Sequence, residues 1–192
     1  MSTDNDGLQG HIPEEIGVFL MLENLVIKNH DKMTGQIPTS IGNLQVLGQL
    51  GLYSNALTGG IPNELYSATS LNYINLQNNQ LTGGIMLGIE KLRNLEKLIL
   101  FNNKFNGAVP FRQMAKTGMR FLGLSNNEFQ GTIPEQISNL PNLEYLYLNN
   151  NNFTGTLTPS YGRLLNLGKC IPRVGTDFRS YIHIVPTPFQ YL

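Results

Sequence analysis

A glycine recurs along this chain at a nearly constant interval, and this regularity limits the folds that the chain can adopt. Each glycine lies in the pattern Leu/Met/Phe-x-Gly-x-Ile/Val/Leu, and the interval is 25 residues once and then 24 residues five times. The glycines are Gly10, Gly35, Gly59, Gly83, Gly107, Gly131 and Gly155. Such a period is typical of chains whose structural repeats stack one upon the next. The sequence therefore predicts a repeating, elongated architecture.

Each position of the repeat has a physical role, which the unit beginning at Leu44 shows clearly. Leu50 and Leu52 stand two positions apart and predict a short strand with one buried face. An asparagine follows the strand, where the backbone turns inward and its amide and carbonyl groups need partners. An inward asparagine can both donate and accept, so a stack of them would form a ladder. The predicted ladder consists of Asn55, Asn79, Asn103, Asn127 and Asn151.

The complete pattern, LxxLxxLxLxxNxLxGxIP, resembles the repeat of the plant-type leucine-rich-repeat (LRR, L domain-like) family, which includes receptor-like proteins and receptor-like kinase ectodomains. Segments 57–62 (LTGGIP) and 129–134 (FQGTIP) match it closely, and the resemblance covers roughly residues 6 to 170. It implies an α/β solenoid, a right-handed superhelix with a parallel β-sheet on the concave face. Its convex side would carry 3-10, short helical or irregular segments, with a 24-residue period.

Two domains follow from the extent of the pattern. Residues 1–170 are expected to form the solenoid, with about seven repeats of which the first and last are partial. Residues 171–192 lack the repeat and contain several prolines and aromatics, so they predict either an irregular C-terminal cap or a loose tail. Two local departures stand out. The first unit carries one extra residue around His30 and Asp31, and Gln113 falls in a column otherwise filled by aliphatic residues, with Met114 as its substitute.

The outward residues of the predicted sheet form columns that contain six aromatic side chains and two lysines, Lys28 and Lys97. Phe121 and Tyr145 should be cross-strand neighbours, with Tyr147 beside them. Aromatics gathered on a surface are favoured anchors at interfaces. Aromatics also suit strands by propensity alone, so sheet pairing is the alternative explanation. The resemblance implies that the concave face binds peptides or proteins, and the predicted ligand-binding residues are Tyr53, Tyr73, Lys97, Phe101, Phe121, Tyr145 and Tyr147.

Composition narrows the classes of function. Lys plus Arg and Asp plus Glu are each 13, so the formal charge is zero and nucleic-acid binding is not expected. The single cysteine, Cys170, excludes an internal disulfide, and no two of the three histidines share a metal-ligand spacing. No nucleotide-binding or kinase motif is present. We therefore expect a non-enzyme with no catalytic residues, no metal and no cofactor.

The sequence constrains the cellular location of the protein less than it constrains the fold. No signal peptide and no membrane-spanning segment is expected, so the chain itself should not insert into a membrane. The family resemblance suggests an extracellular or cell-surface place. Asn152-Phe153-Thr154 is an N-glycosylation acceptor pattern, which supports secretion weakly.

Three functions remain open at this stage. The leading interpretation is a non-catalytic recognition scaffold that binds a protein or peptide through the concave sheet. The second is a structural or ice-binding surface protein that uses the threonine-rich column before the repeat glycines, although Asn106 and Gln130 interrupt that column. The third is an ectodomain piece of a receptor-like kinase.

Overall fold

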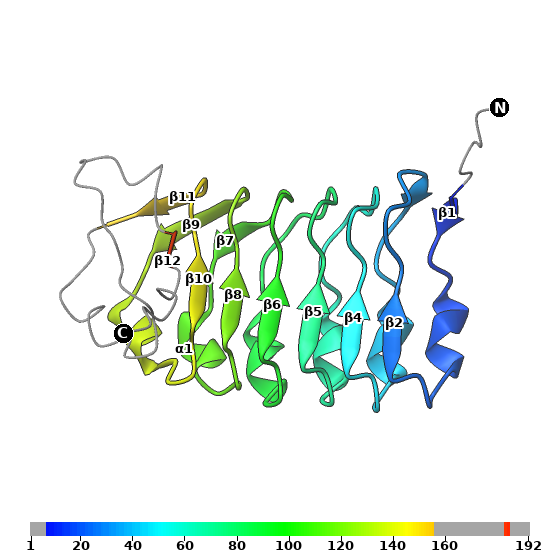
Figure 1. Cartoon of the computed structure of the whole chain (residues 1–192), viewed down its shortest axis with the longest axis horizontal. Coiled ribbons are helices and arrows are strands. Elements are labelled where there is room, and N and C mark those ends of the chain that lie inside the picture. The colour runs from blue at the N-terminus through cyan, green and yellow to red at the C-terminus, as the bar shows by residue number, and fades with distance from the viewer. Residues whose placement is uncertain (1–6, 156–182, 185–192) are drawn as a thin grey trace, which may run out of the picture.

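Each repeat contributes one three-residue strand to a common sheet in the computed structural model, which describes residues 7–155 and 183–184. Neighbouring strands are parallel, and from β4 onward they pair residues 24 positions apart, as in Gln49 with Tyr73 and Tyr73 with Lys97. Figure 1 shows them side by side along the long axis of the molecule. The strands are β2 (Asn24–Val26), β4 (Gln49–Gly51), β5 (Tyr73–Asn75), β6 (Lys97–Ile99), β8 (Phe121–Gly123) and β10 (Tyr145–Tyr147).

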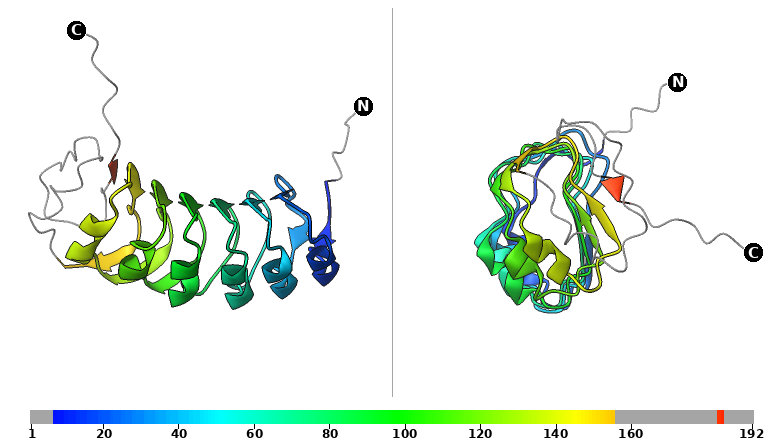
Figure 2. Two further views of the ribbon diagram at one scale, coloured as in Figure 1. Left: turned by 90° about the horizontal axis from the view of Figure 1, so that it is seen from below. Right: turned by 90° about the vertical axis from the view of Figure 1, so that its left-hand side faces the viewer.

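Short helices form the opposite side of each repeat. Five of the six begin directly after the proline of the repeat, and the remaining one follows Met86. Proline suits this position because its fixed φ leads into a helical turn and it has no amide hydrogen to leave unpaired. The helices are η1 (Glu14–Val18), η2 (Thr39–Asn43), η3 (Asn63–Ser67), η4 (Leu87–Lys91), α1 (Phe111–Met114) and η5 (Glu135–Asn139). Figure 2 shows the strands on the inner side of the curved stack and the helices on its outer side.

Additional short strands run along a third side of the stack, and the sequence pattern did not predict them. They form a two-stranded and a three-stranded parallel sheet. Every repeat glycine has a positive φ, and Gly107 at 78° is an example within one of these strands. A side chain rarely adopts that conformation, which explains the glycine at this point of each turn. The strands are β1 (Gly10–His11), β3 (Met33–Thr34), β7 (Asn106–Ala108), β9 (Glu128–Thr132) and β11 (Asn152–Thr154).

The core is a continuous stack of inward side chains. One column changes from leucine to phenylalanine along the stack, so that Leu57 and Leu81 are followed by Phe105, Phe129 and Phe153. The rings of Phe105 and Phe129 are stacked with centroids 6.0 Å apart, and those of Phe129 and Phe153 are stacked at 6.5 Å. Because Phe129 is fully buried between its two neighbours, it joins three successive repeats.

The predicted asparagine ladder is present, and each rung joins two repeats. Asn127 is 8% exposed, and its Oδ1 accepts a hydrogen bond from the backbone amide of Phe105 at 3.0 Å. Its Nδ2 donates to the carbonyls of Leu100, Leu124 and Ser125 at 2.9, 3.0 and 3.2 Å. The rungs at 79, 103 and 151 repeat this arrangement. The amide side chain therefore satisfies the inward backbone groups, as the sequence predicts.

His30 belongs to this ladder, which corrects its placement in an irregular insertion. Its Nδ1 accepts a hydrogen bond from the amide of Leu8 at 3.2 Å, just as Asn79 Oδ1 accepts from Leu57. An imidazole nitrogen can replace the amide oxygen as acceptor. The extra residue of the first repeat therefore lies after His30, in the turn that contains Asp31.

The remaining local prediction concerns the repeat with Gln113. Here the segment forms α1 in place of a 3-10 helix, and Met114 is fully buried while Gln113 is half-buried. The substitution of Met114 for the missing aliphatic residue is thus confirmed. The α/β solenoid with its parallel sheet and short helices is confirmed as well.

Most of segment 171–192 and Cys170 lie outside the described residues. Within it, β12 (His183–Ile184) is described, and it pairs antiparallel with β10, opposite Leu146 and Tyr147. This pairing places two residues of the segment on the last parallel strand, while the cap over the rest of that end stays a prediction.

Candidate functional site: the concave sheet face

The parallel strands line the inner face of the curved stack (Figure 2), and this face carries their outward residues. In β10, for example, Leu146 is buried in the core, and Tyr145 and Tyr147 on either side of it are half-buried. This alternation follows from the two-residue period of a strand. The candidate residues therefore share one face and come from different repeats.

Four aromatic rings lie against one another on this face and are here called the aromatic cluster. Phe121 is central, with ring centroids 5.3 Å from Tyr147, 5.5 Å from Tyr145 and 6.2 Å from Phe101. Phe101 also meets Tyr147 edge-on at 5.5 Å. The predicted pairing of Phe121 with Tyr145 is confirmed by the strand register. Partial burial raises the pKa of Tyr147 above its ordinary value, with Tyr145 contributing.

The two other predicted aromatics have separate partners. Lys28 Nζ lies 5.7 Å from the ring centre of Tyr53, within the range of a cation–π contact. The hydroxyl of Tyr73 accepts a hydrogen bond from Asn75 Nδ2 at 3.0 Å. The six outward aromatics are therefore divided into one cluster of four and two individually engaged tyrosines.

Gly123 lies beneath the aromatic cluster, and sequence reasoning missed its role. A β-carbon added at this position would lie 2.5 Å from Cζ of Phe101 and 3.0 Å from the ring of Phe121. The absence of a side chain thus leaves room for Phe101 to lean over the neighbouring strand. The sequence did contain a signal, namely a glycine that stands in an outward strand column and is flanked by aromatic residues. The repeat period alone does not assign a role to such a glycine.

Replacing Gly123 by alanine should displace the Phe101 ring and open the cluster. We expect the ring-proton NMR shifts of Phe101 to change, with a loss of at most about 1 kcal/mol in unfolding free energy, because the added methyl meets the end of a half-buried ring that must rotate away. Gly51→Ala is the matched control, since a β-carbon there meets its nearest neighbour at 3.4 Å. Unchanged Phe101 shifts in Gly123→Ala would contradict this role.

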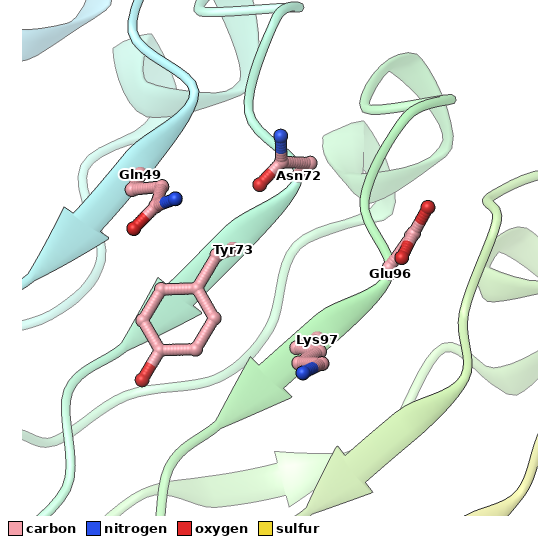
Figure 3. A pocket seen from close by; sticks show the side chains of 5 residues that line it. All are labelled: Gln49, Asn72, Tyr73, Glu96 and Lys97. Carbon is pink, nitrogen blue, oxygen red and sulfur yellow. The ribbon is translucent and has the colours of Figure 1, made fainter. Parts of the chain in front are cut away.

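A polar pocket adjoins the cluster. It has a volume of about 380 Å³ and is lined by Gln49, Asn72, Tyr73, Glu96 and Lys97. Figure 3 shows that these side chains come from three neighbouring repeats, at or just before the beginnings of β4, β5 and β6. Lys97 pairs in register with Phe121, so the pocket and the aromatic cluster meet at β6 and β8. The structure therefore brings the predicted Lys97 and Tyr73 together with three residues that the prediction did not include.

Arg120 and Glu144 lie in the next two repeats, directly before β8 and β10. Arg120 Nε donates to Glu144 Oε1 at 2.8 Å, which joins the repeats of β8 and β10. This hydrogen bond is the main cause of the raised pKa of Arg120, and the charge of Glu96 contributes to it. Arg120 is thus engaged within the protein.

A second asparagine ladder was also missed. The residue before each buried rung has a positive φ, between 54° and 58° from Ser54 to Asn150. These exposed side chains bond to one another, with Asn102 Nδ2 donating to Asn78 Oδ1 and Asn126 Nδ2 donating to Asn102 Oδ1, both at 2.6 Å. Asparagine tolerates this backbone conformation better than most residues. The repeated Asn-Asn dipeptide was the signal that could have revealed it.

The threonine column has an internal role. The hydroxyls of Thr34, Thr58 and Thr154 donate to the carbonyl of the repeat glycine in the preceding turn, at 3.1, 3.3 and 3.4 Å. These bonds give three threonines of the column a partner in the preceding repeat. Asn152 is exposed at the start of β11, and its glycosylation stays a prediction.

Among residues 7–155 and 183–184, no three His, Cys, Asp or Glu side chains come together as a metal site would require. No helix in this part of the chain has the length and apolar character needed to cross a bilayer.

Comparison with known proteins identifies the repeats. The pattern described as "Leucine Rich repeats (2 copies)" matches residues 117–162, and "Leucine Rich Repeat" matches residues 70–92. No curated protein sequence matches the chain. Among solved structures, the LRR ectodomain of the receptor kinase GASSHO1/SCHENGEN3 from Arabidopsis thaliana, in complex with CASPARIAN STRIP INTEGRITY FACTOR 2, is 36% identical with a TM-score of 0.78. That match covers 83% of this chain and 19% of the ectodomain.

Two other Arabidopsis receptor kinases are similar. HAESA, in complex with the peptide hormone IDA and the co-receptor SERK1, is 31% identical with a TM-score of 0.77, covering 83% of this chain and 27% of HAESA. The SOBIR1 ectodomain is 31% identical with a TM-score of 0.58, covering 68% of this chain and 67% of that ectodomain. The chain thus spans about a fifth to a quarter of the two larger ectodomains and two thirds of the smaller one. With its repeat pattern, ladder and sheet, the chain belongs to the plant-type leucine-rich-repeat family.

Proposed function

We propose that the chain is a non-catalytic recognition scaffold that binds a peptide or protein on the concave sheet face. The aromatic cluster carries this proposal, because its four half-buried rings form a ready apolar anchor. Rigid aromatic side chains gathered at one place are favoured as binding hot spots, since little conformational entropy is lost when a ligand covers them.

The similar proteins support this proposal. HAESA is in complex with a peptide hormone and a co-receptor, and GASSHO1/SCHENGEN3 is in complex with CASPARIAN STRIP INTEGRITY FACTOR 2. By the same likeness we place this chain outside the cell, as a unit of a receptor-type ectodomain. The ice-binding alternative has no such support, and the hydroxyls of Thr34, Thr58 and Thr154 have the internal partners described above.

The test is the double variant Phe121→Ser/Tyr145→Ser. A library of random linear peptides is selected on the immobilised wild-type chain, and the affinity of the enriched peptides is then measured for both proteins. We expect the double variant to bind at least about a hundredfold more weakly, because each hot-spot truncation costs about 2 kcal/mol or more.

The fold of the double variant is checked by circular dichroism. Its melting temperature should fall by roughly 3–18 °C with the cooperative transition kept, since three ring contacts worth about 0.5–1.5 kcal/mol each are lost and the buried core is untouched. Tyr53→Ser is the control, because Tyr53 lies on the same face without a ring contact to the cluster. Full binding by the double variant would place the ligand elsewhere.

A further inference from the structure

The end of η1 and the loop that leads from it to β2 carry apolar side chains where later repeats carry polar ones (Figure 1, lower right). The apolar residues of this segment that concern us are Val18, Leu20 and Met21. The equivalent residues of the next three repeats are Asn43, Gln45 and Val46, then Ser67, Thr69 and Ser70, then Lys91, Arg93 and Asn94. Only Val46 among them is apolar, so the repeat itself does not call for apolar residues here.

These apolar side chains are largely open to solvent. Val18 is 68% exposed, Leu20 58% and Met21 82%. Their equivalents also lie at the surface, with Ser70 half-buried and the others exposed, although another repeat precedes each of them. The stacking of repeats therefore leaves these positions uncovered. We call Val18, Leu20, Met21 and the partly exposed Val46 the apolar rim patch.

The backbone beneath the apolar rim patch is fixed by hydrogen bonds. The amide of Phe19 donates to the carbonyl of Ile16 at 3.3 Å, that of Leu20 to Val18 at 2.9 Å, and that of Leu22 to Phe19 at 2.8 Å. Because these amides are engaged, they cannot pair with an extended strand of a partner. A partner that covers the patch must satisfy its own backbone groups, and a helix does so.

The charges around the apolar rim patch are negative. Residues 7–27 contain three glutamates and no lysine or arginine. Glu14 accepts hydrogen bonds from the amides of Thr39 and Ser40 at 3.1 and 2.9 Å, so it is engaged within the protein. Glu15 and Glu23 are exposed, and within residues 7–155 and 183–184 neither forms an ion pair or a side-chain hydrogen bond.

These two carboxylates lie on either side of the patch along the chain. Glu15 and Val18 are three positions apart at the start and end of the last turn of η1, and side chains at this spacing eclipse in a 3-10 helix. Glu23 follows Met21 by two residues. The apolar surface is therefore flanked by anions that can pair with cations of a partner.

We propose that the apolar rim patch docks a cationic amphipathic helix of a partner protein. The helix lays its apolar stripe on Val18, Leu20 and Met21, and lysines or arginines beside the stripe pair with Glu15 and Glu23. The same carboxylates disfavour a second copy of this chain, which would bring like charges together, and an anionic membrane surface. The patch precedes β2, at the opposite end of the sheet from the aromatic cluster, so this inference does not rest on the proposed function.

The decisive variant is Val18→Asn/Leu20→Gln/Met21→Ser, which introduces residues that later repeats hold at these positions. A library of helical peptides with a fixed leucine stripe and all other positions randomised is first depleted on this triple variant and then selected on the wild-type chain. The depletion removes peptides that bind the concave face, because both proteins carry that face. We expect the enriched peptides to carry Lys or Arg beside the stripe and to bind the triple variant at least about tenfold more weakly.

Two further variants separate the apolar contact from the charges. Met86→Ser/Leu87→Gln removes another exposed apolar pair, 46% and 64% exposed, and should bind the enriched peptides like the wild type. Glu15→Gln/Glu23→Gln should weaken binding by about fivefold and reduce its dependence on salt, since two exposed ion pairs are lost. All three variants change exposed side chains, so their melting temperatures should match that of the wild type.

The other occupants are tested with the same triple variant. Failure to enrich any peptide, or enrichment of peptides with acidic or uncharged flanks, would overturn the inference. It would also be overturned if the wild type dimerised in analytical ultracentrifugation and the triple variant did not, because a second copy would then cover the patch. Flotation of the wild type alone with neutral phosphatidylcholine vesicles would assign the patch to a lipid surface instead.

Discussion

Asn127→Ala should lower the free energy of unfolding by about 3 to 5 kcal/mol, because it removes a buried partner from several backbone groups at once. The amide of Phe105 loses its acceptor, and the carbonyls of Leu100, Leu124 and Ser125 lose a shared donor. Each buried group left unpaired costs about 1–3 kcal/mol, and water entering the small space recovers part of the loss. Urea unfolding followed by circular dichroism gives the value, since the chain has no tryptophan.

Asn106→Ala is the matched control for this prediction. Asn106 is an exposed asparagine in β7, and a substitution on the surface should stay within about 0.5 kcal/mol. Asn127→Asp adds a chemical test, because it keeps the acceptor for Phe105 and loses the amide donors. If Asn127→Ala were as stable as Asn106→Ala, the ladder would be incidental to stability.

Phe129→Ala should cost about 3–5 kcal/mol, the range for emptying a buried phenylalanine site. Its ring lies between those of Phe105 and Phe153. The cavity would therefore remove ring contacts that join three successive repeats. Phe129→Leu should cost only about 1 kcal/mol, because Leu57 and Leu81 hold the same column elsewhere in the stack and the shape is partly conserved.

Thermal and urea unfolding of the two variants measure the difference directly. Phe153→Ala provides an internal comparison, since Phe153 is half-buried and has a stacked ring on one side in the described part of the chain. Its loss should therefore be smaller than that of Phe129→Ala. Equal losses for alanine and leucine at position 129 would show that the ring geometry, rather than the filled volume, stabilises the column.

The inward half of the fold could be predicted from the sequence because its partners are backbone groups or identical neighbours. An inward asparagine after a strand, such as Asn103, meets equivalent carbonyls in four successive repeats. The leucine columns are equally determined, since a residue of the strand can point only inward or outward. The period therefore sufficed for the core, the ladder and the parallel sheet.

The outward half of the fold could be predicted from the repeat period only in part. The columns placed all six aromatics on one face, but side-chain rotamers decided which rings met. Phe101 leans over Gly123 into the cluster. In contrast, the ring of Tyr53 contacts a lysine, and the hydroxyl of Tyr73 accepts a hydrogen bond from an asparagine amide. The pocket at Lys97 combines residues of three repeats whose types change from one repeat to the next, so no periodic signal marks it.

His30 shows a further limit of pattern reading. A template that expects asparagine treats histidine as an interruption, yet what this position requires is an acceptor facing the preceding turn. Reading each position by its hydrogen-bonding duty would have placed His30 in the ladder. The second ladder of exposed asparagines would have emerged in the same way.

The stacking of helices and strands has a consequence for how this molecule comes apart. Each helix packs against the helix of the next repeat, from η1 on η2 to α1 on η5, so cohesion is shared among successive interfaces. Such an array behaves as a one-dimensional lattice of coupled units. Denaturant should peel units from the ends inward, and a central defect should divide the lattice into two shorter arrays that melt at their own temperatures.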